Sequence, residues 1–238
     1  DASSVNRAIL DIESSQLESQ QSMNNRELSF SLLLPFKDFG SVDLSFFRAA
    51  PTLMMAVAAV AIIDGAILVH LAIYGLKLGG SLAVAVSMVS AFMLGNALLQ
   101  IPLGWIIDRL DGYIILAVCS FIGAVCSLWM PFLSLDNVII WPLLVIWGGI
   151  TYALYTIALT LLGRRFTGSN LVTANASFAM MWGIGGISGP VISGLALDVM
   201  GPIGLPLTIA ATSGMLLVVV FMRHPEVMGL RSKFLSKN

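Results

Sequence analysis

Residues 82–112 have the sequence LAVAVSMVSAFMLGNALLQIPLGWIIDRLDG. No charged side chain occurs in this stretch before Asp108, and about 20 apolar residues are enough for an α-helix to cross the hydrocarbon core of a bilayer. The stretch then ends on the polar segment Asp108–Gly112. The pattern therefore predicts a transmembrane helix that is followed by a tight turn in water.

The composition extends this prediction to the whole chain. Of the 238 residues, 58% are hydrophobic and 11% are charged, and the mean hydropathy is +0.93. Soluble domains carry about 25% charged residues, so most of the surface of this chain must face lipid. The net charge of −1 indicates no particular partner. No pattern typical of nucleic-acid or phosphate-loop binding occurs, and we expect no nucleic-acid partner.

Six apolar runs, each near or above the length needed to span a bilayer, are separated by polar or glycine- and proline-containing breaks. They predict an all-α membrane protein with a bundle of six transmembrane helices. The runs cover residues 50–72, 82–107, 113–132, 138–162, 171–197 and 204–222.

The segments outside these runs complete the predicted domain organisation. Residues 1–27 are polar and poor in aromatic side chains, and residues 28–48 mix short apolar groups with charges. They are interpreted as a cytoplasmic linker with an interfacial segment, 1–48, before a transmembrane domain, 49–222, and a cytoplasmic tail, 223–238. Because the sequence starts at Asp1 rather than at Met, we expect a piece of a longer protein.

Basic residues predict the orientation. With six spans, eleven of the twelve lysines and arginines fall on one side of the membrane, and Lys77 alone falls on the other. Positive charge marks the cytoplasmic side. Both termini are therefore predicted to be cytoplasmic, in an integral, multi-pass protein of the bacterial inner membrane.

The most specific motif ends the second run, where Gly104 is followed four and five residues later by Asp108 and Arg109. Glycine permits close helix contact, and the carboxylate of Asp108 is expected to bind backbone N–H groups at the next helix start and a neighbouring cation. The motif resembles the G-x-x-x-D-R signature of the major facilitator superfamily. The resemblance implies a conformational latch formed by Gly104, Asp108 and Arg109. An ordinary charged turn is the alternative. Asp111, Gly112 and Tyr113 stand where the family pattern has glycine and then two basic residues.

A second motif lies in the fifth run, where Gly185, Gly189 and Gly194 accompany Pro190. Small residues at this spacing let two helix backbones approach each other, and proline permits a bend. A similar glycine–proline helix occurs in each half of facilitator proteins. The alternative is a close-packed helix without a mechanistic role.

The resemblance implies one half of a twelve-helix carrier, built as two inverted three-helix repeats. The first, second, fourth and fifth spans would line a central cavity, and the third and sixth would face lipid. The implied function is secondary active transport of a small solute by alternating access, as symport or antiport. Its partners would be the solute, the bilayer, and the missing amino-terminal half or a second copy. A receptor or scaffold on the same fold and a dimeric six-helix carrier are the alternatives.

Asp64 is the one acidic residue well inside a predicted span. A charged side chain at the bilayer centre costs about 2.5 kcal/mol or more, which favours the protonated form and suits a proton carrier. We therefore interpret Asp64 as the candidate for proton coupling. A structural, helix-paired aspartate is the alternative.

Several polar and aromatic side chains in the middle of the second, fourth and fifth runs are candidates for the substrate cavity, because aromatic rings with a polar group suit an organic ligand. Plain helix packing explains each of them equally well. The candidates are Asn96, Gln100, Trp147, Tyr152, Tyr155, Asn175 and Trp182.

The sequence does not favour an enzyme. Gly186-Ile-Ser188-Gly189 is similar to the G-x-S-G of rhomboid proteases, but that chemistry needs a histidine base in a partner helix. The two histidines, His70 and His224, lie near the opposite face and beyond the last span. No metal-ligand spacing of cysteine and histidine occurs, so we expect neither a metal nor a cofactor.

Overall fold

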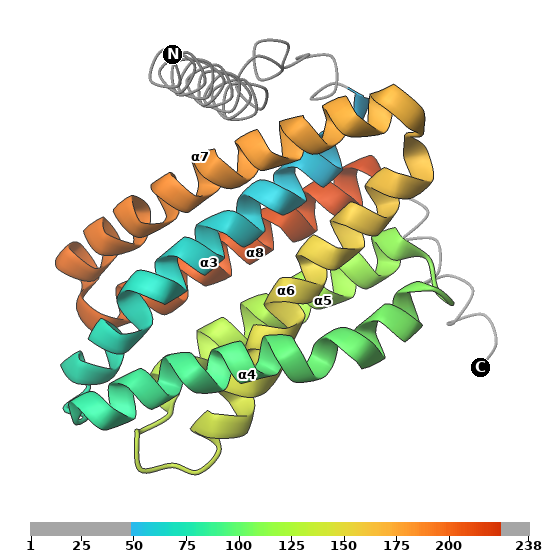
Figure 1. Cartoon of the computed structure of the whole chain (residues 1–238). Coiled ribbons are helices and arrows are strands. Elements are labelled where there is room, and N and C mark those ends of the chain that lie inside the picture. Colours follow the sequence, from blue (N-terminus) through green and yellow to red (C-terminus); the bar gives the residue numbers. More distant parts are fainter. Residues whose placement is uncertain (1–48, 225–238) are drawn as a thin grey trace, which may run out of the picture. The chain divides into compact units, whose positions relative to one another are not determined.

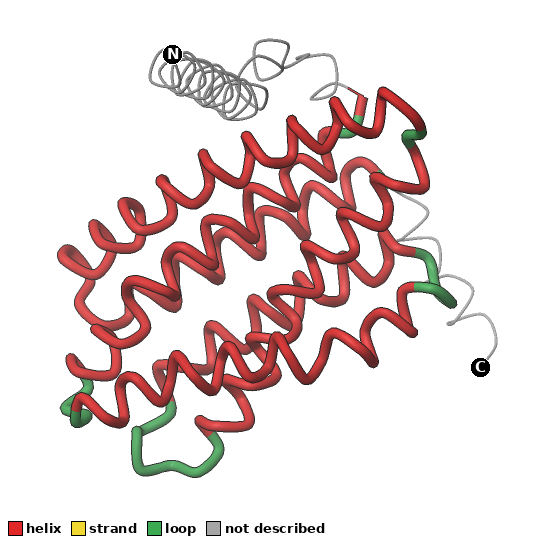
Figure 2. The backbone as a smooth tube through the Cα atoms, in the orientation of Figure 1, coloured by secondary structure: helices red, strands yellow, loops and turns green. Residues whose placement is uncertain are grey.

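The computed structural model describes residues 49–224, which form helices and loops and no strand (Figures 1 and 2). The all-α prediction is therefore confirmed for this part of the chain. The predicted linker, 1–48, and the tail from residue 225 onwards lie outside the described residues. In chain order the elements are α3 (Pro51–Lys77), α4 (Leu82–Ile107), α5 (Gly112–Trp129), the 3-10 helix η2 (Met130–Phe132), α6 (Ile140–Arg165), α7 (Gly168–Met200), the 3-10 helix η3 (Gly201–Ile203) and α8 (Gly204–Arg223).

Each predicted apolar run overlaps one of these α-helices. By length and composition, the described residues hold five candidate membrane spans, and the fifth, residues 168–223, contains both α7 and α8. α3 continues to Lys77, beyond the predicted end at residue 72, because a helix does not stop where the apolar run stops. It ends beside Gly79, whose φ of 85° suits glycine.

Two short polar side chains begin the following helices. The Ser81 hydroxyl accepts a hydrogen bond from the N–H of Val84 at the start of α4. The Asp111 carboxylate accepts hydrogen bonds from Tyr113 and Ile114 at the start of α5. The expectation that Asp108 binds the next helix start is therefore wrong, because Asp108 is the C-cap residue that follows α4 and Asp111 occupies the N-cap position of α5.

Helix pairs distant in sequence build the bundle. α3 packs most extensively against α7, α4 against α6, and α5 against α8. Figure 1 shows the starts of α3, α5 and α7 at the same end of this unit as the last residues of α4, α6 and α8. The loop between η2 and α6 lies at the opposite end (Figure 2).

Glycines allow α4 and α6 to approach backbone to backbone. A Cβ atom added at Gly95 of α4 would overlap the Val145 carbonyl group of α6. One added at Gly148 of α6 would overlap the Phe92 carbonyl group of α4 and lie 3.1 Å from its Cα. Such approach is how helices associate in lipid, where there is no hydrophobic drive between them.

The α3–α7 pair uses the same device. A Cβ atom at Gly185 of α7 would lie 2.6 Å from the Cβ of Ala61 of α3, and one at Gly189 would overlap the Ile62 carbonyl group. From the other side, a Cβ at Gly65 of α3 would lie 2.9 Å from both the Gly186 carbonyl oxygen and Pro190 Cδ. Pro190 lacks the N–H that would otherwise bond the Gly186 carbonyl, and Gly65 lets α3 pass directly over this carbonyl.

We expect Gly148→Ala to lower the thermal unfolding midpoint of the detergent-solubilised protein. The added methyl group has no room against Phe92, and overpacking costs about 1–3 kcal/mol. Gly163→Ala on the same helix is the matched control, because nothing in the described residues lies within 4 Å of its Cβ position. The control should leave the midpoint unchanged or raise it, since alanine is the better helix former. Equal midpoints for the two variants would contradict the close α4–α6 contact.

Candidate functional site

The central polar contact joins α3 to α6 in the middle of both helices. The Tyr152 hydroxyl of α6 donates a hydrogen bond to Asp64 Oδ1 of α3, and both side chains are half-buried. The same hydroxyl lies 3.7 Å from the Met93 Sδ atom of α4. Three helices therefore meet at the Tyr152 hydroxyl group.

Asp64 has no basic partner within residues 49–224, where the one ion pair is formed elsewhere. A hydrogen bond to an ionised group is worth about 1.5–3 kcal/mol, so Tyr152 offsets part of the cost of a charge within a span. The arrangement allows the carboxyl group either to hold a proton or to carry a charge, with the phenol as donor to it.

Tyr152 and Tyr155 share a face of α6 but make different contacts. Tyr155 packs edge-on against Trp182 of α7, with ring centroids 5.1 Å apart, and both are half-buried. This contact lies between α6 and α7, whereas Tyr152 bonds α3. The structure therefore separates two residues that the sequence placed in one group.

The remaining cavity candidates differ in exposure. Trp147 is fully buried, and its ring packs edge-on against Phe92 with centroids 5.6 Å apart. Its indole Nε1 has no hydrogen-bond partner within the described part of the chain. Gln100 Nε2 donates to Asn96 Oδ1 at 2.7 Å on an open side of α4, and Asn175 is exposed on α7.

The motif of Gly104, Asp108 and Arg109 lies at the end of α4. Asp108 Oδ1 is 3.8 Å from the guanidinium group of Arg164, a residue at the end of α6. Arg164 also donates a hydrogen bond to the Ile107 carbonyl oxygen at 3.4 Å, so it contacts the last turn of α4 at two points. The pair is open to solvent, with 77% of the Asp108 side chain exposed.

The other two motif residues make fewer contacts. The Arg109 guanidinium lies 3.7 Å from the centroid of the Trp105 ring, a cation–π contact within the same turn. A Cβ at Gly104 would meet nothing within 4 Å in the described residues. The close helix contact expected at Gly104 is therefore absent from the described residues. Gly95, on the same helix, makes the close approach of α4 instead.

Comparison with known families decides the class of protein. A family model described as Major Facilitator Superfamily matches residues 53–235. The chain belongs to this family. No curated protein and no solved structure matches it.

Membership in the Major Facilitator Superfamily, together with the apolar helices, makes the chain part of an integral, multi-pass membrane protein of a transporter family. The resemblance noted at Asp108 and Arg109 was therefore correct at the level of the family. Within this family the polar groups inside the helices are the natural candidates for a site, because an intramembrane polar group is costly unless it has a role.

The glycine motif of α7 lies directly against α3, as described for Gly185 and Gly189. A Cβ at Gly194 would lie 3.3 Å from His70 Nε2 of α3. His70 Nδ1 is 2.9 Å from the hydroxyl of Ser193, which is fully buried. His70 is thus half-buried in the α3–α7 interface.

The sequence motifs did not predict the contact of Arg164 with Asp108. They also did not predict the close approach at the Gly148-Gly149 pair of α6. His70 and Ser193 are 123 positions apart, so no local pattern links them. A signal existed for the glycines, because adjacent small residues in an apolar helix indicate close packing.

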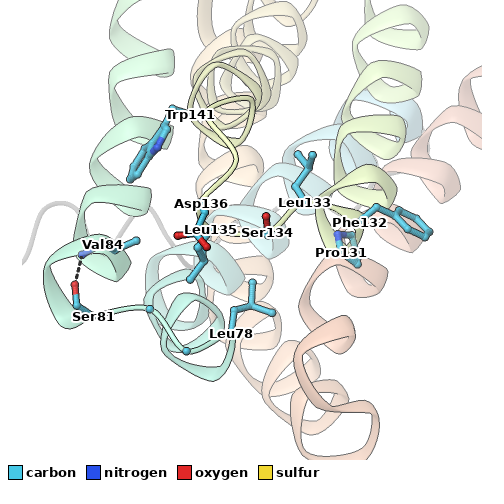
Figure 3. Close-up of a pocket in the computed structure, with 12 residues that line it drawn as sticks. Leu78, Ser81, Val84, Pro131, Phe132, Leu133, Ser134, Leu135, Asp136 and Trp141 are labelled. Atoms are coloured by element: carbon cyan, nitrogen blue, oxygen red, sulfur yellow. Dashed lines mark hydrogen bonds between the residues drawn. The ribbon is translucent and has the colours of Figure 1, made fainter.

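A separate pocket of about 630 Å³ opens at the end opposite to Asp108 (Figure 3). The turn after α3, the start of α4, the η2–α6 loop and Trp141 line it, and none of the predicted cavity residues does. Figure 3 shows Asp136 and Leu135 between Ser81 on one side and Leu133 on the other. Within residues 49–224, no three histidine, cysteine or acidic side chains gather as metal ligands do.

Proposed function

We propose that this chain forms one half of a secondary active transporter that moves a small solute by alternating access. The observation that carries the proposal is the half-buried Asp64–Tyr152 pair, a carboxyl group bonded across two spans that has no ion-pair partner in the described residues. Such a group changes its proton occupancy when its access to water changes, and alternating access produces that change.

The order of helix contacts supports an origin in two inverted repeats, α3–α5 and α6–α8. If each helix of the first repeat is matched to its equivalent in the second, the pair α3–α7 corresponds to the pair α6–α4. Both pairs have extensive helix–helix contacts, and in both pairs glycines allow the two backbones to approach closely. The α5–α8 pair corresponds to itself, and the α3–α8 and α5–α6 contacts correspond to each other.

The open faces of α4 and α7 support a missing half. Few residues of either helix are buried by this chain, and these faces carry the amide side chains of Asn96, Gln100 and Asn175. Amides are costly against lipid. We infer that these faces border a solute cavity shared with an amino-terminal half or, if that half is absent, with a second copy. Tyr155 of α6 packs against Trp182 of α7, and we infer that this aromatic pair forms a further part of the cavity wall.

We infer further that Asp108 and Arg164 act as the latch at the cytoplasmic end. An exposed ion pair contributes about 1 kcal/mol or less to stability. It is therefore suited to break and re-form between two conformations of similar free energy.

Topology provides the first test. Single cysteines at positions 20 and 134, in a variant without Cys119 and Cys126, are labelled with a membrane-impermeant maleimide. In intact cells we expect labelling at position 134 and none at position 20, because the basic residues place both termini in the cytoplasm. Permeabilised cells provide the control. Labelling of position 20 from outside would show that the orientation is wrong.

Asp108→Asn should slow transport at least several-fold while leaving expression and the thermal midpoint nearly unchanged, since the side chain is 77% exposed. Asp111→Asn is the matched control, because asparagine caps a helix as well as aspartate does. A panel of solutes, screened for uptake by cells that express the full-length protein, supplies the substrate for the assay. Wild-type transport by Asp108→Asn would remove the latch from the proposal.

Asp64→Asn should abolish accumulation of that solute against its gradient yet allow downhill exchange in proteoliposomes. The amide keeps the shape of the carboxyl group and its contact with Tyr152, but it releases no proton. Asp136→Asn, an exposed acid of the η2–α6 loop, is the control and should accumulate solute normally. If Asp64→Asn still accumulates solute, coupling does not run through this residue. If the wild type transports nothing in the screen, the proposed function itself fails.

A further inference from the structure

A small cavity lies where three helix ends meet, at the same end as Asp108 and away from the Asp64 site. The first turn of α3, the last residue of α6 and the last residue of α8 surround it, and Tyr113 at the start of α5 completes the wall. Its volume is about 170 Å³, room for a small anion with a few waters at about 30 Å³ each. Within residues 49–224, the lining residues are 49–53, Tyr113, Arg165, Arg223 and His224.

Two arginine residues from different helices line this cavity. Arg165 ends α6 and Arg223 ends α8. Neither forms an ion pair within residues 49–224, where the one pair joins Arg164 and Asp108. The acid next to that pair, Asp111, is bonded to the first turn of α5.

The third positive element is the start of α3. Its N-cap residue, Ala50, provides no side-chain acceptor, and the first turn holds no acidic residue. A helix N-terminus carries about half a positive charge. Two arginines against it repel one another and the helix end, and in the described residues no carboxylate compensates them. This electrostatic cost is removed when an anion occupies the cavity.

The remaining wall is rigid. The Tyr113 ring stacks on the His224 imidazole with centroids 3.6 Å apart and an interplanar angle of 18°. The Thr52 hydroxyl, on a side chain that is 3% exposed, lies 3.4 Å from His224 Nε2. These contacts tie the start of α5 and the end of α8 to the first turn of α3.

We propose that this cavity binds a phosphate group. Arginine binds phosphate oxygens through paired N–H groups, and a helix N-terminus adds a favourable dipole. The phosphate belongs either to the headgroup of an anionic phospholipid, because the site lies at a membrane end of the bundle, or to free phosphate in solution. The site is independent of solute transport through the Asp64 region.

The test uses the purified full-length protein in nanodiscs. In the first arm the discs contain phosphatidylcholine only, and inorganic phosphate is titrated against chloride at constant ionic strength while the thermal midpoint is measured. In the second arm the discs contain phosphatidylglycerol, and native mass spectrometry counts the lipid that stays bound. Ligand that binds the folded state raises the midpoint by mass action.

Arg165→Gln and Arg223→Gln should each lower the affinity for the anion about tenfold or more, because each variant removes one charge-assisted hydrogen bond. Arg109→Gln is the matched control, since it removes one charge from the same end of the bundle outside the cavity. The three arginines are exposed, so these variants should fold. The comparison of phosphate with chloride on the wild type needs no variant.

Stabilisation by phosphate alone would assign the site to a soluble anion, and retention of phosphatidylglycerol alone would assign it to a lipid headgroup. Either result, lost in Arg165→Gln and Arg223→Gln and kept in Arg109→Gln, supports the site. If neither phosphate nor phosphatidylglycerol binds, the proposal is overturned. An equal loss of binding in all three variants also overturns it. Binding that emerges only in Glu226→Gln or Asp43→Asn also overturns it, because an acid of the chain itself would then occupy the cavity.

Discussion

Backbone contact at glycines is the interaction on which the rest of this structure depends. In lipid the helices satisfy their own hydrogen bonds and gain nothing from hiding apolar surface, so their association rests on close packing. Gly95 and Gly148 bring α4 and α6 together, and Gly185 and Gly189 do the same for α7 and α3. Larger side chains at these four positions would hold the helix pairs apart.

The two close pairs also determine where the polar groups meet. α3 belongs to one pair and α6 to the other, and the Asp64–Tyr152 hydrogen bond crosses between them. Because this bond links the two pairs, the proposed change in protonation of the Asp64 carboxyl group would act at the contact between them.

Charge at the ends of the helices follows a different rule from charge in the middle. Asp108 and Arg164 form a weak pair in water, where breaking it costs little. Arg165 and Arg223 face the start of α3 together with no described acid to balance them. The same end of the molecule therefore holds one compensated set of charges and one that an external anion would compensate.

The sequence by itself determined the helices, the family and the identity of the intramembrane acid. Apolar runs predict helices because lipid leaves the backbone no alternative, and 82–107 matched α4 at both ends. The spacing of Gly104, Asp108 and Arg109 was enough to indicate the family. These features are local, so a single stretch of chain records them.

The tertiary structure alone decided the partners. Nothing in the sequence pairs Tyr152 with Asp64, 88 positions away, or His70 with Ser193. The tertiary structure also assigns two expected roles to other residues. Asp111 rather than Asp108 caps α5, and Gly95 rather than Gly104 makes the close contact of α4. A motif specifies which residue types lie at a helix end. Which of them touches a neighbour depends on how the helices cross, and crossing is set by small residues elsewhere in the chain, such as Gly148.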